Sequence, residues 1–205
     1  MQLASAIDRT RYNIFEWRYN LSIPWKIVMA VAMAGLTGVL AQVRIPLEWS
    51  PIPITGQTLA VLLAGVLLGR RWGGASMAIY AVLGIAGVPW FNGLTSGLGA
   101  TGGYLIGYIL AALFIGYFTD KYVKSRYFIS MLGLMLFSSI VIVYVPGVIW
   151  LAFWMKYAVG TAVSFSALMA MGVYPFIVGA VLKSITAASI VKVITPKKDY
   201  TGNSL

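Results

Sequence analysis

Long apolar runs alternate along this chain with short polar or proline-rich breaks. A helix of about 20 predominantly apolar residues is long enough to cross the hydrocarbon core of a bilayer. The pattern predicts an all-α membrane protein with six transmembrane helices. The expected spans are about 25–43, 56–69, 72–88, 99–118, 127–145 and 173–194. We expect residues 1–24 to form a cytoplasmic or interfacial segment, residues 25–194 the transmembrane domain, and residues 195–205 a cytoplasmic tail.

Two of the breaks differ from ordinary loops. Residues 44–55 contain three prolines, which excludes a regular helix. At membrane depth such backbone is tolerated only where it is shielded or lines a cavity. Residues 146–172 are too apolar for a free loop, although Pro146, Gly147, Lys156 and Gly160 interrupt them. We expect these residues to form a partly helical lid or a re-entrant connection.

Small residues recur at every fourth position in two of the spans, which places them on one helix face where another backbone can approach closely. They are Ala30, Ala34 and Gly38 in the first span, and Gly99, Gly103, Gly107 and Ala111 in the fourth. An uncharged loop of turn-forming residues, 90–97, precedes the fourth span. A polar loop that leads into a close-packed helix suits the floor of a small-molecule pocket. A plain outer loop followed by an ordinary packed helix is an equal alternative.

Composition supports the membrane class and narrows the function. The chain is 60% hydrophobic and only 10% charged, and it contains neither cysteine nor histidine. Its five acidic residues lie outside the long apolar runs. These absences remove the usual nucleophile–base pairs and the commonest metal ligands. We therefore expect no enzyme, no metal site and no cofactor. We also expect no signal peptide, because the first residues are polar and charged.

The net charge of +10 is better explained by membrane topology than by nucleic-acid binding, because the basic residues flank apolar spans. With the N-terminus placed inside, twelve of the 15 basic residues are cytoplasmic, Arg44 and Lys156 fall outside, and Lys183 lies within the sixth span. The positive-inside rule therefore predicts a multi-pass protein of the cell membrane with both termini cytoplasmic.

Lys183 is the main candidate for ligand binding, because a lone ammonium group inside a membrane span is costly. No acid lies one turn away, since Ala180 and Ala187 occupy those positions. An incoming carboxylate or strongly polar group would supply the missing partner. Snorkelling of the lysine toward the membrane surface is the alternative.

Uncharged hydrogen-bonding side chains occur around the outer loops. They include Thr55, Gln57, Thr58, Asn92, Thr95, Ser96, Thr101 and Tyr104. Together with apolar and aromatic walls, a few such groups suit a small amide-like or ureido ligand. Helix capping is the alternative role for Thr55 and Thr101. The chain has no G-x-x-x-x-G-K-[ST] sequence, so uphill uptake would need energy from a partner.

The chain resembles the BioY family at SPIPITGQTLAVLLAGVLLG (50–69), GIAGVPWFNG (84–93) and ATGGYLIGY (100–108). Members of this family are the biotin-specific substrate-binding (S) components of energy-coupling factor (ECF) transporters. The resemblance extends from about residue 27 to residue 195. It implies six membrane helices and a biotin pocket near the extracellular side, built from the first and third outer loops and helices four to six. It also implies coupling to a transmembrane T component and two cytoplasmic ATPases.

The resemblance implies roles for particular residues. In these S components an A-x-x-x-A pattern on the first helix serves docking to the T component, and Ala30 and Ala34 match it, extended by Gly38. The sixth helix often carries an Asp-x-x-Lys pair that binds the ligand. Lys183 matches the lysine of that pair, whereas Ala180 stands where the aspartate is expected.

We therefore predict a high-affinity biotin-binding component of an ECF transporter that works in the lipid bilayer and binds no nucleic acid. The predicted ligand-binding residues are Lys183, Asn92, Tyr104, Thr101, Gly102, Gly103, Gln57 and Thr55, and the predicted docking residues are Ala30, Ala34 and Gly38. An S component for another small vitamin or heterocycle is one alternative. A channel or structural membrane subunit without a ligand is the other.

Overall fold

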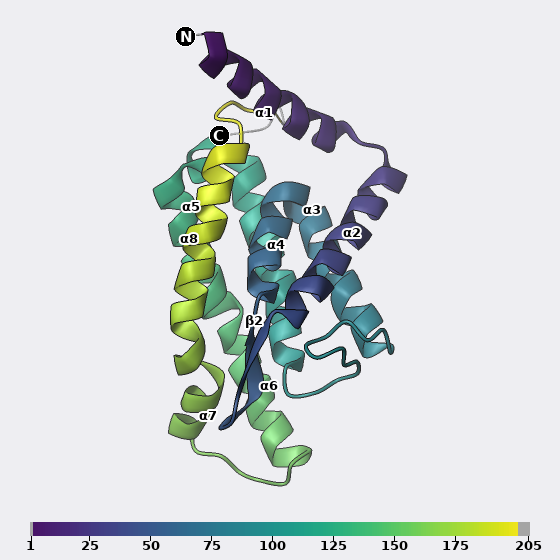
Figure 1. Ribbon diagram of the computed structural model, residues 1–205, viewed down its shortest axis with the longest axis vertical. Helices are drawn as coiled ribbons and strands as arrows, with labels where there is room; N and C mark the ends of the chain where they lie inside the picture. The colour runs from purple at the N-terminus through teal and green to yellow at the C-terminus, as the bar shows by residue number, and fades with distance from the viewer. Residues whose placement is uncertain (1, 201–205) are drawn as a thin grey trace.

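Apolar helices that run side by side make up most of the structure, a computed structural model that describes residues 2–200 (Figure 1). The elements in chain order are α1 (Gln2–Asn20), α2 (Ile23–Gln42), β1 (Arg44–Leu47), β2 (Ser50–Thr55), α3 (Gln57–Ile85), α4 (Gly102–Lys121), a 3-10 turn (Val123–Arg126), α5 (Phe128–Phe137), a π-helical turn (Ser138–Ile142), α6 (Tyr144–Tyr157), α7 (Phe165–Gly172), a 3-10 turn (Tyr174–Phe176) and α8 (Ile177–Ile194). Of the predicted terminal segments, residues 1 and 201–205 lie outside the described residues.

These elements form six membrane-crossing segments. Four are long and apolar enough to span a bilayer, namely Ile23–Gln42, Gly102–Lys121, Phe128–Tyr157 and Phe165–Ile194. The other two are the halves of α3, which fold back on each other at Gly69. The predicted all-α membrane fold with six spans is confirmed.

Gly69 produces the reversal within α3. Its φ of 77° and ψ of 179° lie in a region that is essentially open to glycine alone. Other glycines let the two halves and α4 approach closely. A Cβ on Gly65 would lie 2.7 Å from the carbonyl oxygen of Ala112, and one on Gly73 would lie 2.8 Å from the carbonyl oxygen of Ala64. After the reversal, the third span therefore packs directly against the short second span.

The connection 146–172 is not the expected lid or re-entrant segment. The fifth span continues to Tyr157 instead of ending at residue 145. Pro146 lies in the first turn of α6, just after the π-helical turn. A helix tolerates proline there, because residues in the first turn need no N–H to bond to an earlier carbonyl oxygen. The chain then leaves the helix for residues 158–164. Ser164 caps α7, because its Oγ accepts a hydrogen bond from the backbone N–H of Ala167 at 3.3 Å.

The proline-rich residues 44–55 form an antiparallel β-hairpin at the outer end of the bundle (Figure 1). Arg44 pairs with Thr55 at its base, and the register is irregular around Pro46, which has no N–H to donate to the ladder. Ser50 Oγ donates a hydrogen bond to the carbonyl oxygen of Met171 at 2.7 Å. This contact ties the hairpin to α7.

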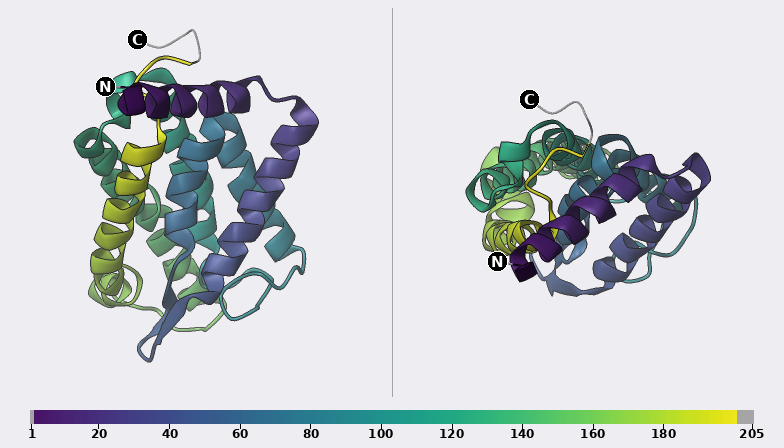
Figure 2. Two further views of the ribbon diagram at one scale, coloured as in Figure 1. Left: turned by 45° about the horizontal axis from the view of Figure 1, so that its top comes forward. Right: turned by 90° about the horizontal axis from the view of Figure 1, so that it is seen from above.

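Helix α1 crosses the bundle at the other, inner end, where the last described residues also lie (Figure 2). Arg18 of α1 donates to Asp120 Oδ1 at 2.9 Å and to the carbonyl oxygen of Val66 at 3.2 Å. The hydroxyl of Tyr200, in the C-terminal tail, donates to the same carboxylate oxygen at 2.8 Å. Arg126 is fully buried and donates to the carbonyl oxygen of Lys198 at 2.7 Å. This end holds most of the basic residues, which makes it the cytoplasmic end.

Candidate functional site

A cavity of about 40 Å³ lies toward the outer end of the bundle, between β2, α3, α4, α6, α8 and the loop that follows α3. Its lining consists of Ile52, Pro53, Thr55, Gln57, Thr58, Phe91, Asn92, Thr101, Tyr104, Leu105, Tyr108, Val143, Tyr144, Phe176 and Lys183. Six of the eight predicted ligand-binding residues are in this set. The fold therefore brings together residues from four distant parts of the sequence.

Lys183 reaches inward from α8 rather than outward to the membrane surface. Its Nζ donates a hydrogen bond to the backbone carbonyl oxygen of Thr55 at 2.9 Å, across the base of the hairpin. It forms no ion pair with any carboxylate in the described part of the chain. An ammonium group has three N–H donors, so one neutral acceptor leaves both its charge and most of its donors unsatisfied. This arrangement favours an anionic or strongly polar ligand over snorkelling.

Thr55 and Gln57 belong to a hydrogen-bond chain along one wall. The Thr55 hydroxyl donates to Gln57 Oε1 at 2.7 Å, and Gln57 Nε2 donates to the hydroxyl of Tyr80 at 2.6 Å. Tyr80 in turn donates to the carbonyl oxygen of Trp90 at 3.3 Å, while Trp90 Nε1 donates to the carbonyl oxygen of Tyr80 at 3.0 Å. These hydrogen bonds fix the orientation of the Gln57 amide and hold the outer loop against α3.

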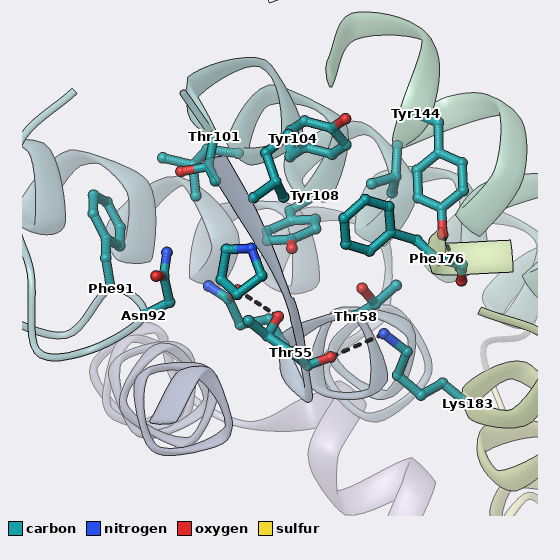
Figure 3. A pocket seen from close by; sticks show the side chains of 15 residues that line it. Thr55, Thr58, Phe91, Asn92, Thr101, Tyr104, Tyr108, Tyr144, Phe176 and Lys183 are labelled. Atoms are coloured by element: carbon teal, nitrogen blue, oxygen red, sulfur yellow. Dashed lines mark hydrogen bonds between the residues drawn. The ribbon is translucent and has the colours of Figure 1, made fainter. Parts of the chain in front are cut away.

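Aromatic side chains form the facing wall (Figure 3). Tyr104 and Tyr108 lie one turn apart on α4. The Tyr104 hydroxyl donates to the carbonyl oxygen of Gly172 at 2.8 Å, and that of Tyr144 donates to the carbonyl oxygen of Phe176 at 3.1 Å. Both hydroxyls therefore connect helices. The Tyr104 hydroxyl therefore donates within the protein, and the Tyr104 side chain lines the cavity.

Asn92 and Thr101 each have a polar side chain that lines the cavity. Asn92 lies across the cavity from Lys183, with Thr55 between them (Figure 3). Its side-chain amide has no hydrogen-bond partner among residues 2–200, although its carbonyl oxygen accepts one from Thr95. Thr101 occupies the N-cap position of α4 but makes no side-chain capping bond. The N-cap of α3 is Gly56 rather than Thr55. The structure therefore shows no capping bond from either threonine.

Gly102 and Gly103 lie outside the cavity lining, in the contact between α4 and α6. A Cβ on Gly103 would lie 2.1 Å from the carbonyl oxygen of Pro146, and one on Gly102 would lie 2.7 Å from the Trp150 ring. A Cβ on Gly107 would lie 2.7 Å from Cα of Val143. The predicted close approach of another backbone to this glycine strip is confirmed at Gly103 and Gly107. These glycines position the aromatic wall and do not themselves line the cavity.

The predicted docking residues lie on the face of α2 that packs inside the bundle. Ala30 and Ala34 are 0% exposed. A Cβ on Gly38 would lie 3.0 Å from Cβ of Trp90. This small-residue face is therefore occupied by the chain's own elements. The outward face of α2 carries larger apolar side chains, among them Val31 and Val39.

Several cavity residues were not predicted from the sequence. Tyr108 could have been found, because it follows Tyr104 by one helical turn on the same face. Thr58 was recognised as a donor next to Gln57 but was not assigned to the site. Tyr144 and Phe176 gave no comparable signal, because they flank the segment whose path the sequence pattern does not define.

Comparisons with known proteins agree with this arrangement. A model described as "BioY family" matches residues 16–199. The "Probable biotin transporter BioY" of Methanothermobacter thermautotrophicus is 46% identical over 142 residues, covering 67% of this chain and 90% of the relative. The "Biotin transporter BioY" of Thermotoga maritima is 31% identical over 169 residues, covering 80% of this chain and 92% of the relative.

A solved structure also matches. The crystal structure of the S-component for biotin from an ECF-type ABC transporter aligns with a TM-score of 0.71 and 26% sequence identity. The alignment covers 84% of this chain and 93% of the other. Because the family match spans most of the sequence and the structural match spans most of the fold, this chain belongs to the BioY family.

Proposed function

We propose that this chain is the membrane-embedded biotin-binding S component of an ECF-type uptake transporter. The observation that carries the proposal is the position of Lys183, which borders the outer cavity and has no counter-ion among residues 2–200. Membership of the BioY family and the similarity to a biotin S component support the choice of ligand.

The chemistry of biotin matches the groups around the cavity. Its carboxylate or its ureido oxygen would accept hydrogen bonds from the Lys183 ammonium group. The free amide of Asn92, on the other side, offers both a donor and an acceptor to the remaining polar group. The fused rings and the aliphatic chain would pack against the faces of Tyr104, Tyr108 and Phe176. A few fixed polar groups in an aromatic pocket are typical of sites for small molecules.

Binding requires the cavity to enlarge. Its volume of about 40 Å³ is far below the roughly 300–1,000 Å³ of typical ligand pockets. The loop that follows α3 borders the cavity through Phe91 and Asn92. The hairpin covers the same region and is held to α7 through the hydrogen bond from Ser50 to the Met171 carbonyl oxygen. We infer that the ligand enters from the outer side by displacing one or both of these segments.

Transport against a gradient would require partner subunits. The chain contains no phosphate-binding loop, and the matching structure comes from an ECF-type ABC transporter. We therefore propose that this chain assembles with a transmembrane T component and two cytoplasmic ATPases. For the contact surface on α2 we propose its outward face, because Ala30 and Ala34 are buried against the rest of the chain.

The test is biotin binding to the purified protein and to Lys183→Ala, measured by isothermal titration calorimetry. A hydrogen bond to a charged group contributes about 1.5–3 kcal/mol, so we expect affinity to fall about 10- to 150-fold. Lys156→Ala is the matched control, because this lysine lies at the outer end of α6 and not in the cavity lining. Affinity unchanged by Lys183→Ala would remove this lysine from the site.

The identity of the ligand has a separate test. Mass spectrometry of small molecules that co-purify with the protein should detect biotin. A thermal-shift screen across other vitamins tests the alternative ligand class, and stabilisation by another vitamin but not by biotin would overturn the choice of ligand. Stabilisation by none of them would favour a channel or structural subunit.

A further inference from the structure

A second and larger cavity, of about 650 Å³, opens at the cytoplasmic end of the bundle, where α1, α2, α3 and α4 meet. Five cationic side chains and one carboxylate line it: Arg18, Lys26, Arg70, Arg71, Lys121 and Asp120. None of them contributes to the outer cavity. We call this space the inner basic cavity.

The single carboxylate of the inner basic cavity is already engaged. Asp120 pairs with Arg18 at 2.9 Å, and its other oxygen accepts a hydrogen bond from the backbone N–H of Arg70 at 3.0 Å. The side chains of Lys26, Arg70, Arg71 and Lys121 form no ion pair with the described carboxylates. The cavity therefore carries a net positive charge that the protein itself does not neutralise.

Neutral neighbours hold three of these four cations. Lys26 Nζ donates to the carbonyl oxygen of Tyr19 at 2.9 Å. The Arg70 guanidinium group lies 5.0 Å from the centre of the Tyr117 ring, and Lys121 Nζ donates to the Tyr117 hydroxyl at 3.1 Å. Carbonyl and aromatic contacts orient a cation but leave its charge available. An anion that enters this space would meet several oriented donors at once.

An apolar groove continues from the inner basic cavity toward the membrane. It has a volume of about 310 Å³ and shares Arg18, Met29 and Leu68 with the cavity. Its other walls are apolar side chains from α1, α2 and α3, including Trp17 and Leu36. The groove lies in the angle between α1 and α2, where α1 crosses the inner end of the bundle (Figure 2).

We propose that the inner basic cavity and the groove together bind one anionic phospholipid of the inner leaflet. The phosphate would lie among Lys26, Arg70 and Arg71, and an acyl chain would lie in the groove. Basic pockets between transmembrane helices on the cytoplasmic side suit anionic headgroups. Trp17 and Trp72 line the two spaces, and tryptophan is enriched at the depth of the lipid headgroups.

The combination of charge and apolar surface selects this ligand over simpler ones. A free phosphate ion would use the cations and leave the groove unfilled. An apolar helix of another protein would fill the groove and leave the cations without partners. A phospholipid satisfies both parts. Bound there, it would also hold α1 against α2 and α3, since the lining comes from all three helices.

The test compares phosphatidylglycerol, which is anionic, with phosphatidylcholine, which is zwitterionic, on delipidated protein. Binding is measured by native mass spectrometry and by thermal unfolding. Each basic residue near an anionic lipid surface contributes about a fivefold factor in affinity. The double variant Arg70→Gln/Arg71→Gln should therefore bind phosphatidylglycerol about 30-fold more weakly. Arg9→Gln/Lys124→Gln removes the same charge from exposed positions outside the cavity and should bind like the wild type.

Two further measurements distinguish the possible ligands. Ala32→Trp adds bulk to the groove from an exposed position of α2, and it should weaken binding of phosphatidylglycerol but not of glycerol 3-phosphate. Circular dichroism and size-exclusion chromatography check that all variants remain folded. Equal binding of the two lipids, or of glycerol 3-phosphate and phosphatidylglycerol, would overturn the proposal. So would an Arg70/Arg71 variant that loses a partner subunit while its lipid affinity is unchanged.

Discussion

Replacing Tyr104 with phenylalanine separates the two roles that this side chain has in the structure. The substitution removes only the hydroxyl, which donates to the carbonyl oxygen of Gly172 at 2.8 Å in a buried position. The ring, which lines the outer cavity, remains. The hydroxyl connects α4 to the end of α7, so its loss should affect stability much more than ligand binding.

The magnitude follows from what is left behind. Removing one partner of a buried hydrogen bond leaves the other unsatisfied, at a cost of about 1–3 kcal/mol. For a chain of this size, a loss of 1 kcal/mol lowers the melting temperature by about 2–4 °C. Tyr104→Phe should therefore melt several degrees below the wild type. Biotin affinity should stay within about twofold, because the unchanged ring makes the proposed contact.

Thermal unfolding in detergent and calorimetric titration with biotin measure the two quantities on the same preparations. Tyr144→Phe is the matched control, because its hydroxyl makes an equivalent bond to the carbonyl oxygen of Phe176 at 3.1 Å. The two variants should behave alike. A tenfold loss of biotin affinity in Tyr104→Phe, without loss of stability, would show that the hydroxyl contacts the ligand and would refute this reasoning.

Two further predictions concern the cytoplasmic end. Gly69→Ala should destabilise the protein by about 1–3 kcal/mol, because its backbone region is unfavourable for any residue with a Cβ. The measurement is thermal unfolding with Gly133→Ala as the control, where a Cβ meets nothing within 4 Å; equal stability of the two variants would contradict the role of Gly69. Burial raises the pKa of the Tyr200 hydroxyl above its usual range. The unfolded chain then loses this proton first as pH rises past about 10, so stability should fall with rising pH. Tyr200→Phe should show a smaller alkaline loss in pH-dependent unfolding, and an identical pH profile would contradict this explanation.

The membrane architecture could be predicted because it depends on the lengths of the apolar runs and the positions of the basic residues, which are read directly from the sequence. The length of an apolar run, compared with the thickness of a bilayer, predicts a span. The distribution of lysine and arginine predicts which ends are cytoplasmic. Lys183 could be singled out for the same reason, since a cation within an apolar span is costly wherever the helix lies. Each of these inferences depends only on one helix and on the bilayer or water around it.

Contacts between helices could not be read in this way. The four-residue spacing of Ala30 and Ala34 shows that something packs closely on that face, but it does not say whether a partner or the chain itself does so. Only the folded structure shows that the chain's own elements bury this face. Pro146 was taken as a break, whereas the preceding π-helical turn places it where a helix tolerates it.

The outer cavity shows the same division. The sequence by itself identified Lys183, Asn92 and Gln57 as polar groups suited to a ligand, because their chemistry is visible one residue at a time. Tertiary structure decided that the Tyr104 hydroxyl bonds to Gly172, 68 positions away, and that Tyr144 comes to lie on the same wall. Such contacts depend on how complete helices pack against one another, and the free energy of that packing is distributed over many residues rather than carried by any local pattern.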